Sequence, residues 1–308
     1  MSLRFGAHMS IAGGIDRSVG RAEAAGCEAL QIFTKSARQW AAKPLTEDQV
    51  HAFRRQRAEA GIAPVVAHAS YLINLASGDD RLWERSTDSC AMELGRCREL
   101  GLDGLVLHPG AHGGDGEKAG LGRVARALER IFRHAPEGPK LLLETTAGQG
   151  TALGGRLQHL RWLLDRFEDN RAGVCLDTCH LHAAGYALGT PEACAATLSR
   201  IDGIVGFNRV EAIHCNDSLG EAGSHLDRHA HIGTGTIGER GFAALLADPR
   251  LDGLPALLET PKDEKGEWDR ANLARLRALH RGETKLPAPP PAARSRQGRG
   301  GATVGQVR

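Results

Sequence analysis

The segment GVCLDTCHLHAAGY, residues 173–186, combines a short apolar run with a cluster of metal-binding residue types. Thiolates and imidazoles are the preferred ligands of structural zinc, so the cluster alone suggests a small closed metal site. The candidates for that site are Cys175, Cys179, His180 and His182. The apolar run GVCLD, which ends at Asp177, suggests something different, because short runs without strict alternation are typical of strands covered on both faces.

Similar apolar runs recur along the chain, with helical segments between them. The eight runs are RFGAH (4–8), EALQIF (28–33), PVVAH (64–68), GLVLH (104–108), KLLLE (140–144), GVCLD (173–177), EAIHC (211–215) and PALLE (255–259). Eight strand–helix alternations predict an α/β fold, a (β/α)8 TIM barrel, with a doubly wound open sheet as the competing topology. No glycine-rich phosphate loop follows the first run, which disfavours the nucleotide-binding form of the open sheet.

Two of the intervening segments carry clear helix signals. TEDQVHAFRRQRAEAG (46–61) opens with a capping box at Thr46 and Gln49 and closes at a glycine, and DDRLWERSTDSCAMELGRCRELG (79–101) is a long amphipathic stretch that also ends at a glycine. We therefore expect a helix in each segment.

The composition is that of a globular protein, with 41% hydrophobic and 25% charged residues. No apolar run approaches the roughly 20 residues that span a bilayer, and the N-terminus has no signal-peptide core, so we expect a cytoplasmic protein without a membrane partner. The seven cysteines are an odd number scattered along the chain, which fits reduced thiols rather than a disulfide framework.

The C-terminal segment KLPAPPPAARSRQGRGGATVGQVR (285–308) is rich in proline, glycine and arginine. Its few large apolar residues cannot offset the entropy of ordering, so we expect a barrel domain over residues 1–284 and a disordered tail over residues 285–308. Five of the 39 Lys and Arg residues and no acidic residue lie in the tail, so residues 1–284 hold 34 basic against 37 acidic groups, a net charge of −3. Charge therefore gives no independent indication of a polyanionic partner.

Histidine, aspartate or glutamate is the last or next-to-last residue in seven of the eight apolar runs. In a parallel barrel all strand C-termini open on one face, so these side chains would converge in one polar cup. A single such residue is more often solvated or hydrogen-bonded than a ligand, but a set of buried carboxylates and imidazoles would stay unsatisfied without cations. The set is His8, His68, His108, Glu144, Asp177, His214 and Glu259, with Phe33 at the end of the remaining run.

His180, three residues after Asp177, and the pair Asp227 and His229 fit the same cup. The nine candidate metal ligands are then His68, His108, Glu144, Asp177, His180, His214, Asp227, His229 and Glu259. This mixture of carboxylates and imidazoles suits Zn²⁺ or Mn²⁺ better than Mg²⁺ or Ca²⁺. Catalytic zinc keeps about three protein ligands and an open position, so the set predicts up to three ions and hydrolytic chemistry, and three ions would raise the net charge to about +3.

Longer motifs surround these residues. They are FTKSARQW (33–40), HASYLINLAS (68–77), LHPGAHGG (107–114), LLETTAGQG (142–150), CLDTCHLHAAGY (175–186), IHCNDS (213–218), GSHLDRHAHIGTGTIG (223–238) and LETPK (258–262). Together they make nearly the whole chain ahead of the tail resemble the endonuclease IV (deoxyribonuclease IV) family, the zinc-dependent apurinic/apyrimidinic (AP) endonucleases of base-excision repair.

The resemblance implies a barrel with three zinc ions held by the nine residues above, Mn²⁺ being an alternative at one position. Glu144 would bridge the first ion, with His68 and His108, and the second ion, with Asp177, His214 and Glu259. The third ion would take His180, Asp227 and His229. Other histidines of the cup, His8 foremost, would lie outside the ligand set, and Cys175 and Cys179 would be packing residues.

The resemblance also implies an activity. The family cleaves double-stranded DNA 5′ to an abasic site, leaving a 3′-hydroxyl and a 5′-deoxyribose phosphate, and trims blocked 3′ ends; we expect a monomer. Glu144 and Glu259 are the expected catalytic residues, orienting the attacking water. Arg38, Tyr71 and Leu72 would enter the duplex at the lesion.

Three points qualify the resemblance. Leu219 occupies a position where the family usually has lysine, which would weaken one backbone contact. A sugar isomerase of the related metal-dependent barrel type is the main rival interpretation, but it does not explain Asp227 and His229. A DNA-binding module without catalysis is the second rival, and nine converging ligands disfavour it.

Overall fold

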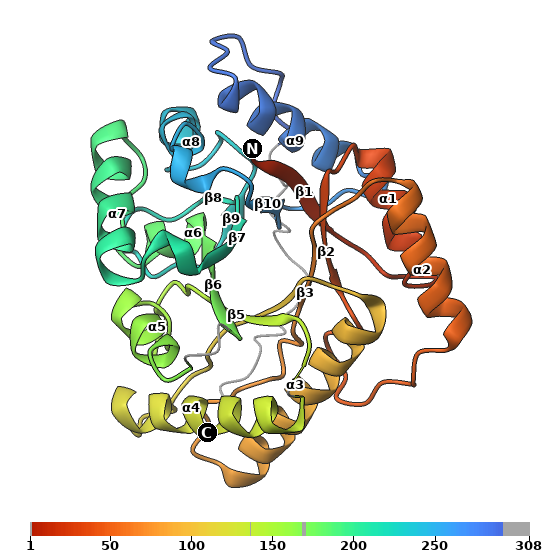
Figure 1. Ribbon diagram of the computed structural model, residues 1–308. Coiled ribbons are helices and arrows are strands. Elements are labelled where there is room, and N and C mark those ends of the chain that lie inside the picture. The colour runs from red at the N-terminus through yellow and green to blue at the C-terminus, as the bar shows by residue number, and fades with distance from the viewer. Residues whose placement is uncertain (1, 136, 168–170, 292–308) are drawn as a thin grey trace, which may run out of the picture.

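The computed structural model of the protein describes residues 2–135, 137–167 and 171–291. Within these residues eight parallel strands close into a barrel in chain order, with the last strand pairing with the first (Figure 1). The strands are β1 (Arg4–Met9), β2 (Ala29–Phe33), β3 (Val65–His68), β4 (Gly104–Leu107), β5 (Lys140–Glu144), β6 (Ala172–Asp177), β7 (Val210–His214) and β10 (Pro255–Leu258). The predicted (β/α)8 TIM barrel is confirmed, and the open sheet is excluded because the sheet has no edge strand.

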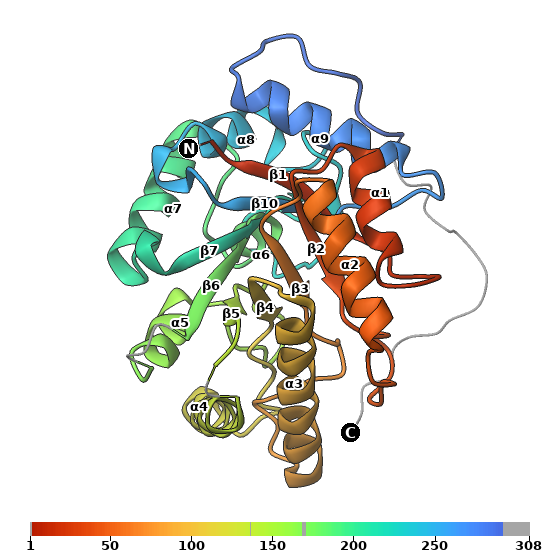
Figure 2. The same ribbon diagram turned by 45° about the vertical axis from the view of Figure 1, so that its right-hand side comes forward.

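Helices surround the barrel, and Figure 2 shows α1, α2 and α3 side by side along its outside. The helices are α1 (Arg17–Ala25), α2 (Glu47–Glu59), α3 (Asp80–Leu100), α4 (Glu117–His134), α5 (Leu157–Leu164), α6 (Thr178–Ala183), α7 (Pro191–Ile204), α8 (Gly238–Leu246) and α9 (Glu267–His280), with short 3₁₀ turns η1 (Phe207–Arg209) and η2 (Pro249–Leu251). Both predicted helices are confirmed: α2 begins with the reciprocal hydrogen bonds of the Thr46–Gln49 capping box, and α3 ends at Gly101 in the left-handed conformation.

The strands alternate between two buried environments. One residue from each of seven strands forms a separate apolar layer inside the barrel, namely Ala29, Val66, Val106, Leu142, Cys175, Ala212 and Leu257. Their chain neighbours face outward into a much larger core beneath the helices; on β5, for example, Leu142 lies inside while Leu141 and Leu143 belong to the outer core. The apolar runs show no alternation in sequence because both faces of every strand are buried.

The same alternation determines which side chains reach the mouth of the barrel. Side chains two residues apart on a strand point to the same face. The residue two positions after Leu142 is therefore the next interior residue towards the carboxyl end of β5, and it is Glu144. An apolar layer thus closes the barrel directly beneath the polar residues at its mouth.

A two-stranded element extends the mouth on the β7 side. Strands β8 (Asp217–Ser218) and β9 (His229–Ala230) pair antiparallel and bring the segment around Asp227 back towards the barrel. The buried carboxylate of Asp217 accepts hydrogen bonds from the backbone N–H groups of Gly235, Ile237 and Gly238. These bonds fix the loop that follows β9, because they satisfy backbone N–H groups that have no hydrogen-bond partner within a strand or helix.

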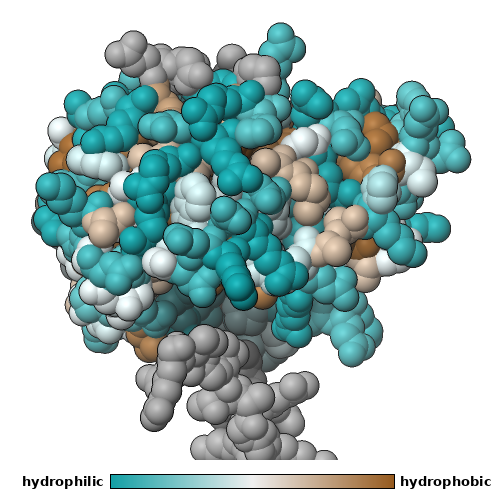
Figure 3. Space-filling view, turned by 90° about the horizontal axis from the view of Figure 1, so that it is seen from below, coloured by the Kyte–Doolittle hydropathy of each residue, from teal (hydrophilic) through white to brown (hydrophobic). Residues whose placement is uncertain are grey.

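The face of the molecule in Figure 3 is mostly hydrophilic, with scattered hydrophobic residues. No helix within the described ranges combines the length and apolarity needed to cross a bilayer. Of the expected tail, residues 285–291 are described: Leu286 packs against the outer core, and the carbonyl of Pro287 accepts a hydrogen bond from Arg275. Residues 292–308 lie outside the described residues, so the division at residue 284 stays a prediction.

Barrel closure between β1 and β2 requires glycine at position 6. A Cβ atom there would lie 2.0 Å from the carbonyl oxygen of Ala29, a backbone atom that cannot move without opening the sheet. We expect Gly6→Ala to lower the free energy of unfolding by about 1–3 kcal/mol or more. Gly20→Ala is the matched control, because Gly20 lies in α1 with nothing within 4 Å of its Cβ position, and alanine there should stabilise by about 0.5–1 kcal/mol. Denaturant unfolding measures the free energy of unfolding of both variants. Equal changes in the two variants would contradict the requirement for glycine at position 6.

Candidate metal centre

Six of the nine predicted ligands occupy equivalent places on six strands. Each lies two residues beyond a member of the inner apolar layer, at the last interior position of its strand or just after it. They are His68, His108, Glu144, Asp177, His214 and Glu259. Their convergence follows from the pleat, because successive interior residues of one strand stack towards the same end of the barrel.

Glu144 lies at the centre of the group, with no solvent-exposed surface. Its Oε2 atom is 3.1 Å from Nε2 of His68 and 3.1 Å from Nε2 of His108. Its other oxygen, Oε1, is 2.9 Å from Nδ1 of His214. The two oxygens of one carboxylate therefore face two different sets of ligand atoms, as a bridging carboxylate requires.

The set around Oε1 of Glu144 contains Asp177, His214 and Glu259. Nδ1 of His214 is 3.3 Å from Oε2 of Glu259 and 3.8 Å from Oδ2 of Asp177. Asp177 and His214 are fully buried, whereas the side chain of Glu259 is 17% exposed. Glu259 is therefore the carboxylate of this set that water can reach.

His180, Asp227 and His229 form a third set. Asp227 presents Oδ2 to Nε2 of His180 at 3.3 Å and Oδ1 to Nε2 of His229 at 3.4 Å. His180 lies in the short helix α6, which Asp177 caps by accepting a hydrogen bond from the backbone N–H of His180. Asp177 is therefore a member of the second set and also caps the helix that carries His180 of the third set.

The spacing within the three sets fits divalent ions. Bonds of about 2.0–2.2 Å to nitrogen and oxygen at tetrahedral angles place neighbouring ligand atoms about 3.3–3.5 Å apart. The separations given above range from 2.9 to 3.8 Å. In addition, Nε2 of His229 is buried and has no hydrogen-bond partner, although it faces two carboxylates. The residues present therefore fit metal ions in all three sets.

Backbone carbonyls orient three of the histidines. Nδ1 of His68 bonds to the carbonyl of Ala69, Nδ1 of His180 to that of Thr145, and Nδ1 of His229 to that of Glu259. A ring nitrogen that donates to a carbonyl carries the proton, which leaves the lone pair on Nε2. In each of these rings Nε2 faces a carboxylate of its own set, and Nδ1 of His180 additionally lies 3.4 Å from Oε1 of Glu144.

The two glutamates are held in the charged form. Burial by itself would raise the pKa of Glu144, but the neighbouring His214 and His108 hold that pKa well below its ordinary value. Burial would likewise raise the pKa of Glu259, and the neighbouring His214 and His68 keep it well below the usual range. Both side chains are thus carboxylates near neutral pH, the form that binds cations.

The cysteines of the opening segment take different places. Cys175 belongs to the apolar layer beneath the ligands, as predicted. Cys179 is closer to the centre, since its sulfur lies within 4.8 Å of ligand atoms of Asp177 and His229. Its thiol donates to the carbonyl of Arg228 at 3.6 Å, and burial raises its pKa to about 12. Cys175 lies in the apolar layer, and no group of converging ligand atoms joins both cysteines to His180 and His182, so the local knuckle of two cysteines and two histidines is absent among the described residues.

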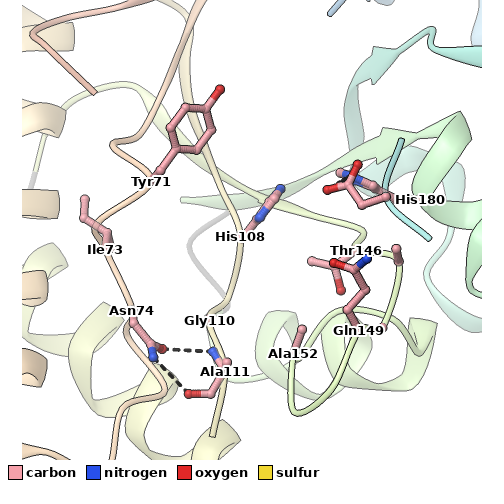
Figure 4. A pocket seen from close by; sticks show the side chains of 13 residues that line it. Tyr71, Ile73, Asn74, His108, Gly110, Ala111, Thr146, Gln149, Ala152 and His180 are labelled. Atoms are coloured by element: carbon pink, nitrogen blue, oxygen red, sulfur yellow. Dashed lines mark hydrogen bonds and ion pairs between the residues drawn. The ribbon is translucent and has the colours of Figure 1, made fainter. Parts of the chain in front are cut away.

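A cavity of about 290 Å³ opens beside His108, His180 and Asp227. Figure 4 shows Tyr71, His108 and His180 on its walls, with Asn74 bonded to Ala111 below them. These two hydrogen bonds join the loop after β3 to the loop after β4, so the cavity has a fixed wall on this side.

The three residues expected to contact DNA lie on two neighbouring loops. The side chain of Tyr71 is 68% exposed and packs edge-on against Phe33, while Leu72 is half-buried and Arg38 is exposed. The hydroxyl of Ser70 donates to the carbonyl of Ala37, which ties the loop of Tyr71 to the loop of Arg38. Leu219, the departure from the family pattern, is 61% exposed.

Sequence reasoning missed two residues that contact the ligands. Asn216 donates from Nδ2 to Asp177 and accepts a hydrogen bond from the backbone N–H of Glu259. Gln31 contacts Glu259, His214 and His8. On β2 the residue two positions after Ala29 of the inner apolar layer is Gln31. Selecting the last residue of each apolar run gave Phe33 instead.

Comparison with known proteins agrees with this geometry. The family model described as "Xylose isomerase-like TIM barrel" matches residues 19–279. A protein of Chloroflexus aurantiacus named "Probable endonuclease 4" is 50% identical over 281 residues, which cover 91% of this chain and 99% of that protein. The crystal structure of endonuclease IV from Thermus thermophilus superposes with a TM-score of 0.81 at 41% identity, over 91% of this chain and 99% of that one.

A more distant structure, a D-tagatose 3-epimerase-like protein, shares the fold with a TM-score of 0.70 at 17% identity, over 91% of this chain and 99% of that one. Identity at that level shows the barrel alone. The Chloroflexus and Thermus proteins are 50% and 41% identical to this chain over 91% of its length, and this chain therefore belongs to the endonuclease IV family of xylose isomerase-like TIM barrels.

Proposed function

We propose that this protein is a metal-dependent AP endonuclease that cleaves DNA 5′ to abasic sites and takes part in base-excision repair. The observation that carries the proposal is the presence of three sets of ligand atoms at one barrel mouth, two of them sharing Glu144. The similarity to proteins named endonuclease 4 and endonuclease IV supports it. The cleavage would leave a 3′-hydroxyl and a 5′-deoxyribose phosphate, and the same site would trim blocked 3′ ends.

Each set of ligands would hold one Zn²⁺ ion, with Mn²⁺ as an alternative at one position. The first set is His68, His108 and Glu144; the second is Glu144, Asp177, His214 and Glu259; the third is His180, Asp227 and His229. When bound, such ions activate water and stabilise negative charge on a phosphoryl group. They would also reverse the net charge of −3 over residues 1–284, which otherwise repels DNA.

The two catalytic glutamates would have different tasks. Glu144 has no exposed surface and is surrounded by four histidines, so it would hold its neighbours in place rather than contact the attacking water. Glu259 is partly exposed and keeps Oε2 facing His214 while Oε1 accepts a hydrogen bond from Gln31. We assign to Glu259 the orientation of the attacking water and the acceptance of its proton.

Arg38, Tyr71 and Leu72 would contact the duplex at the lesion. Tyr71 is the most exposed large apolar side chain at this mouth, and its ring is held between Phe33 and His68. A ring fixed in this way can occupy space in a base stack without losing much conformational entropy. Extruding an abasic nucleotide is inexpensive because it has no base to unstack.

The third set of ligands favours a nuclease over a sugar isomerase. Asp227 and His229 come from the β8–β9 element, which is additional to the eight strand–helix units of the barrel. An isomerase with one or two ions gives these residues no task. We further propose that the protein acts as a monomer in the cytoplasm, on double-stranded DNA with abasic sites or blocked 3′ ends.

Metal content tests the ligand assignment. We expect the native protein to retain three Zn²⁺ ions after dialysis and His229→Ala to retain one fewer, because the third set keeps only two ligands. Cys179→Ala and His51→Ala, the latter an exposed histidine of α2, are the controls and should retain the native content. Elemental analysis gives the stoichiometry. Loss of an ion in Cys179→Ala would make that sulfur a ligand and overturn the assignment.

The position of the cut tests the reaction. A labelled duplex with one tetrahydrofuran abasic analogue should be broken immediately 5′ to the lesion by the Zn²⁺-loaded protein, leaving a 3′-hydroxyl that a polymerase can extend. Excess EDTA should abolish the break, added Zn²⁺ should restore it, and an undamaged duplex should stay intact. A break on the 3′ side, or binding without a break, would refute the proposal.

Glu259→Gln tests the catalytic role. The amide keeps the size of the side chain but cannot accept a proton, so we expect turnover of the abasic duplex to fall by about 10²–10⁴-fold while binding of that duplex persists. Glu99→Gln, an exposed glutamate of α3, is the control. Single-turnover cleavage and a DNA-binding titration separate the two effects. Near-native cleavage by Glu259→Gln would exclude the role.

A further inference from the structure

Gln31 occupies the position on β2 that the metal-binding candidates occupy on other strands. It follows Ala29 of the inner apolar layer by two residues, and its side chain is fully buried inside the barrel. Through the strand pairing it lies beside His8 of β1. Six other strands carry a histidine or carboxylate ligand candidate at this level, so the carboxamide of Gln31 lies among charged groups rather than among apolar ones.

All the strong hydrogen-bonding groups of Gln31 are used. Its Nε2 donates to Oε1 of Glu259 at 2.5 Å and to Nδ1 of His8 at 3.0 Å. Its Oε1 is 2.8 Å from Nε2 of His214. A buried amide with two donated bonds and one accepted bond has little freedom to rotate.

These partners determine the orientation of the amide. A carboxylate oxygen only accepts hydrogen bonds, so the NH₂ group must face Glu259 and the carbonyl oxygen must face His214. Nε2 of His214 then has to carry the proton, and the lone pair lies on Nδ1. Nδ1 is the atom directed at Glu144, Asp177 and Glu259.

His214 differs from its neighbours in this respect. His68, His180 and His229 present Nε2 and are oriented by backbone carbonyls, which no substitution removes. His214 presents Nδ1 and is oriented by a side chain. The orientation of His214 thus depends on one replaceable residue.

We propose that Gln31 is a positioning residue of the metal centre, which selects Nδ1 of His214 as a ligand and aligns Glu259 beside it for the second ion. The inference rests on the metal centre of the proposed function and assigns to it a residue outside the ligand set. Groups that orient metal ligands typically contribute 10- to 100-fold to metal affinity. The effect should be confined to the ion held by His214 and Glu259, because no other described ligand candidate bonds to Gln31.

The test is the metal affinity of Gln31→Met, measured without DNA. Methionine keeps the length of the side chain but neither orients the imidazole nor donates to the carboxylate. We expect Zn²⁺ titration against a chromogenic chelator to show one ion bound about 10- to 100-fold more weakly and two bound as in the native protein. Gln31→Ala leaves room for a water molecule that can replace the hydrogen bonds to His214 and Glu259, so the loss of Zn²⁺ affinity in this variant should be smaller.

A purely structural role for Gln31 predicts a different result. In that case Gln31→Met would lower the melting temperature of the metal-free protein and leave the affinities for all three Zn²⁺ ions unchanged. Asn272→Leu is the matched control, because Asn272 is also a fully buried amide that donates to a histidine, His231, but it contacts no ligand. We expect this control to melt earlier with native metal affinities, whereas Gln31→Met loses affinity for one ion.

The possible outcomes are distinct. Native affinity for all three ions in both Gln31 variants, or an equal loss for all three, would overturn the positioning role whether or not the native protein cuts DNA. Selective loss of one ion supports the role even if the native protein fails to cut an abasic duplex, because the titration contains no DNA. A native protein that binds no divalent ion would refute both the role and the proposed function.

Discussion

A carboxylate with no access to solvent, Glu144, is the constraint around which the mouth of the barrel is arranged. A buried charge is costly unless opposite charges and hydrogen bonds compensate it. Glu144 has histidines within 2.9–3.1 Å of both oxygens, and one of them, His214, faces two further carboxylates in turn. The result is a connected set of ligands in which each group is oriented by a neighbour, and such a set fits several ions rather than one.

The barrel supplies the rigidity that this arrangement needs. An apolar layer of small and branched side chains fills the interior beneath the ligands, so the ligands have a dry floor on one side and the loops on the other. The outer core holds the strands in register. Because six of the nine ligands lie one pleat beyond a packed residue, their positions are tied to those of their strands, and this pre-organisation keeps open coordination positions available for substrate.

Orientation comes from three different sources at this mouth. Backbone carbonyls direct His68, His180 and His229. Side-chain amides act elsewhere: Asn216 bonds to Asp177, and Gln31 bonds to His214 and Glu259. The capping bond from Asp177 to the start of α6 places His180 for the third set. A hydrogen bond from Ser70 to the carbonyl of Ala37 joins the loops that carry Arg38 and Tyr71.

The sequence alone determined the barrel and the ligand candidates, because eight apolar runs with polar ends express a pattern that every parallel barrel must satisfy. The helix over residues 47–59 was equally predictable, since its capping box is local. The sequence did not determine which face of β2 carries the functional residue, because a fully buried strand shows no alternation and only the closed sheet reveals that Gln31, not Phe33, lies inside. Likewise, only the tertiary structure showed that Glu144 faces two sets of ligands and that His214 presents Nδ1, since both depend on contacts between residues more than sixty positions apart.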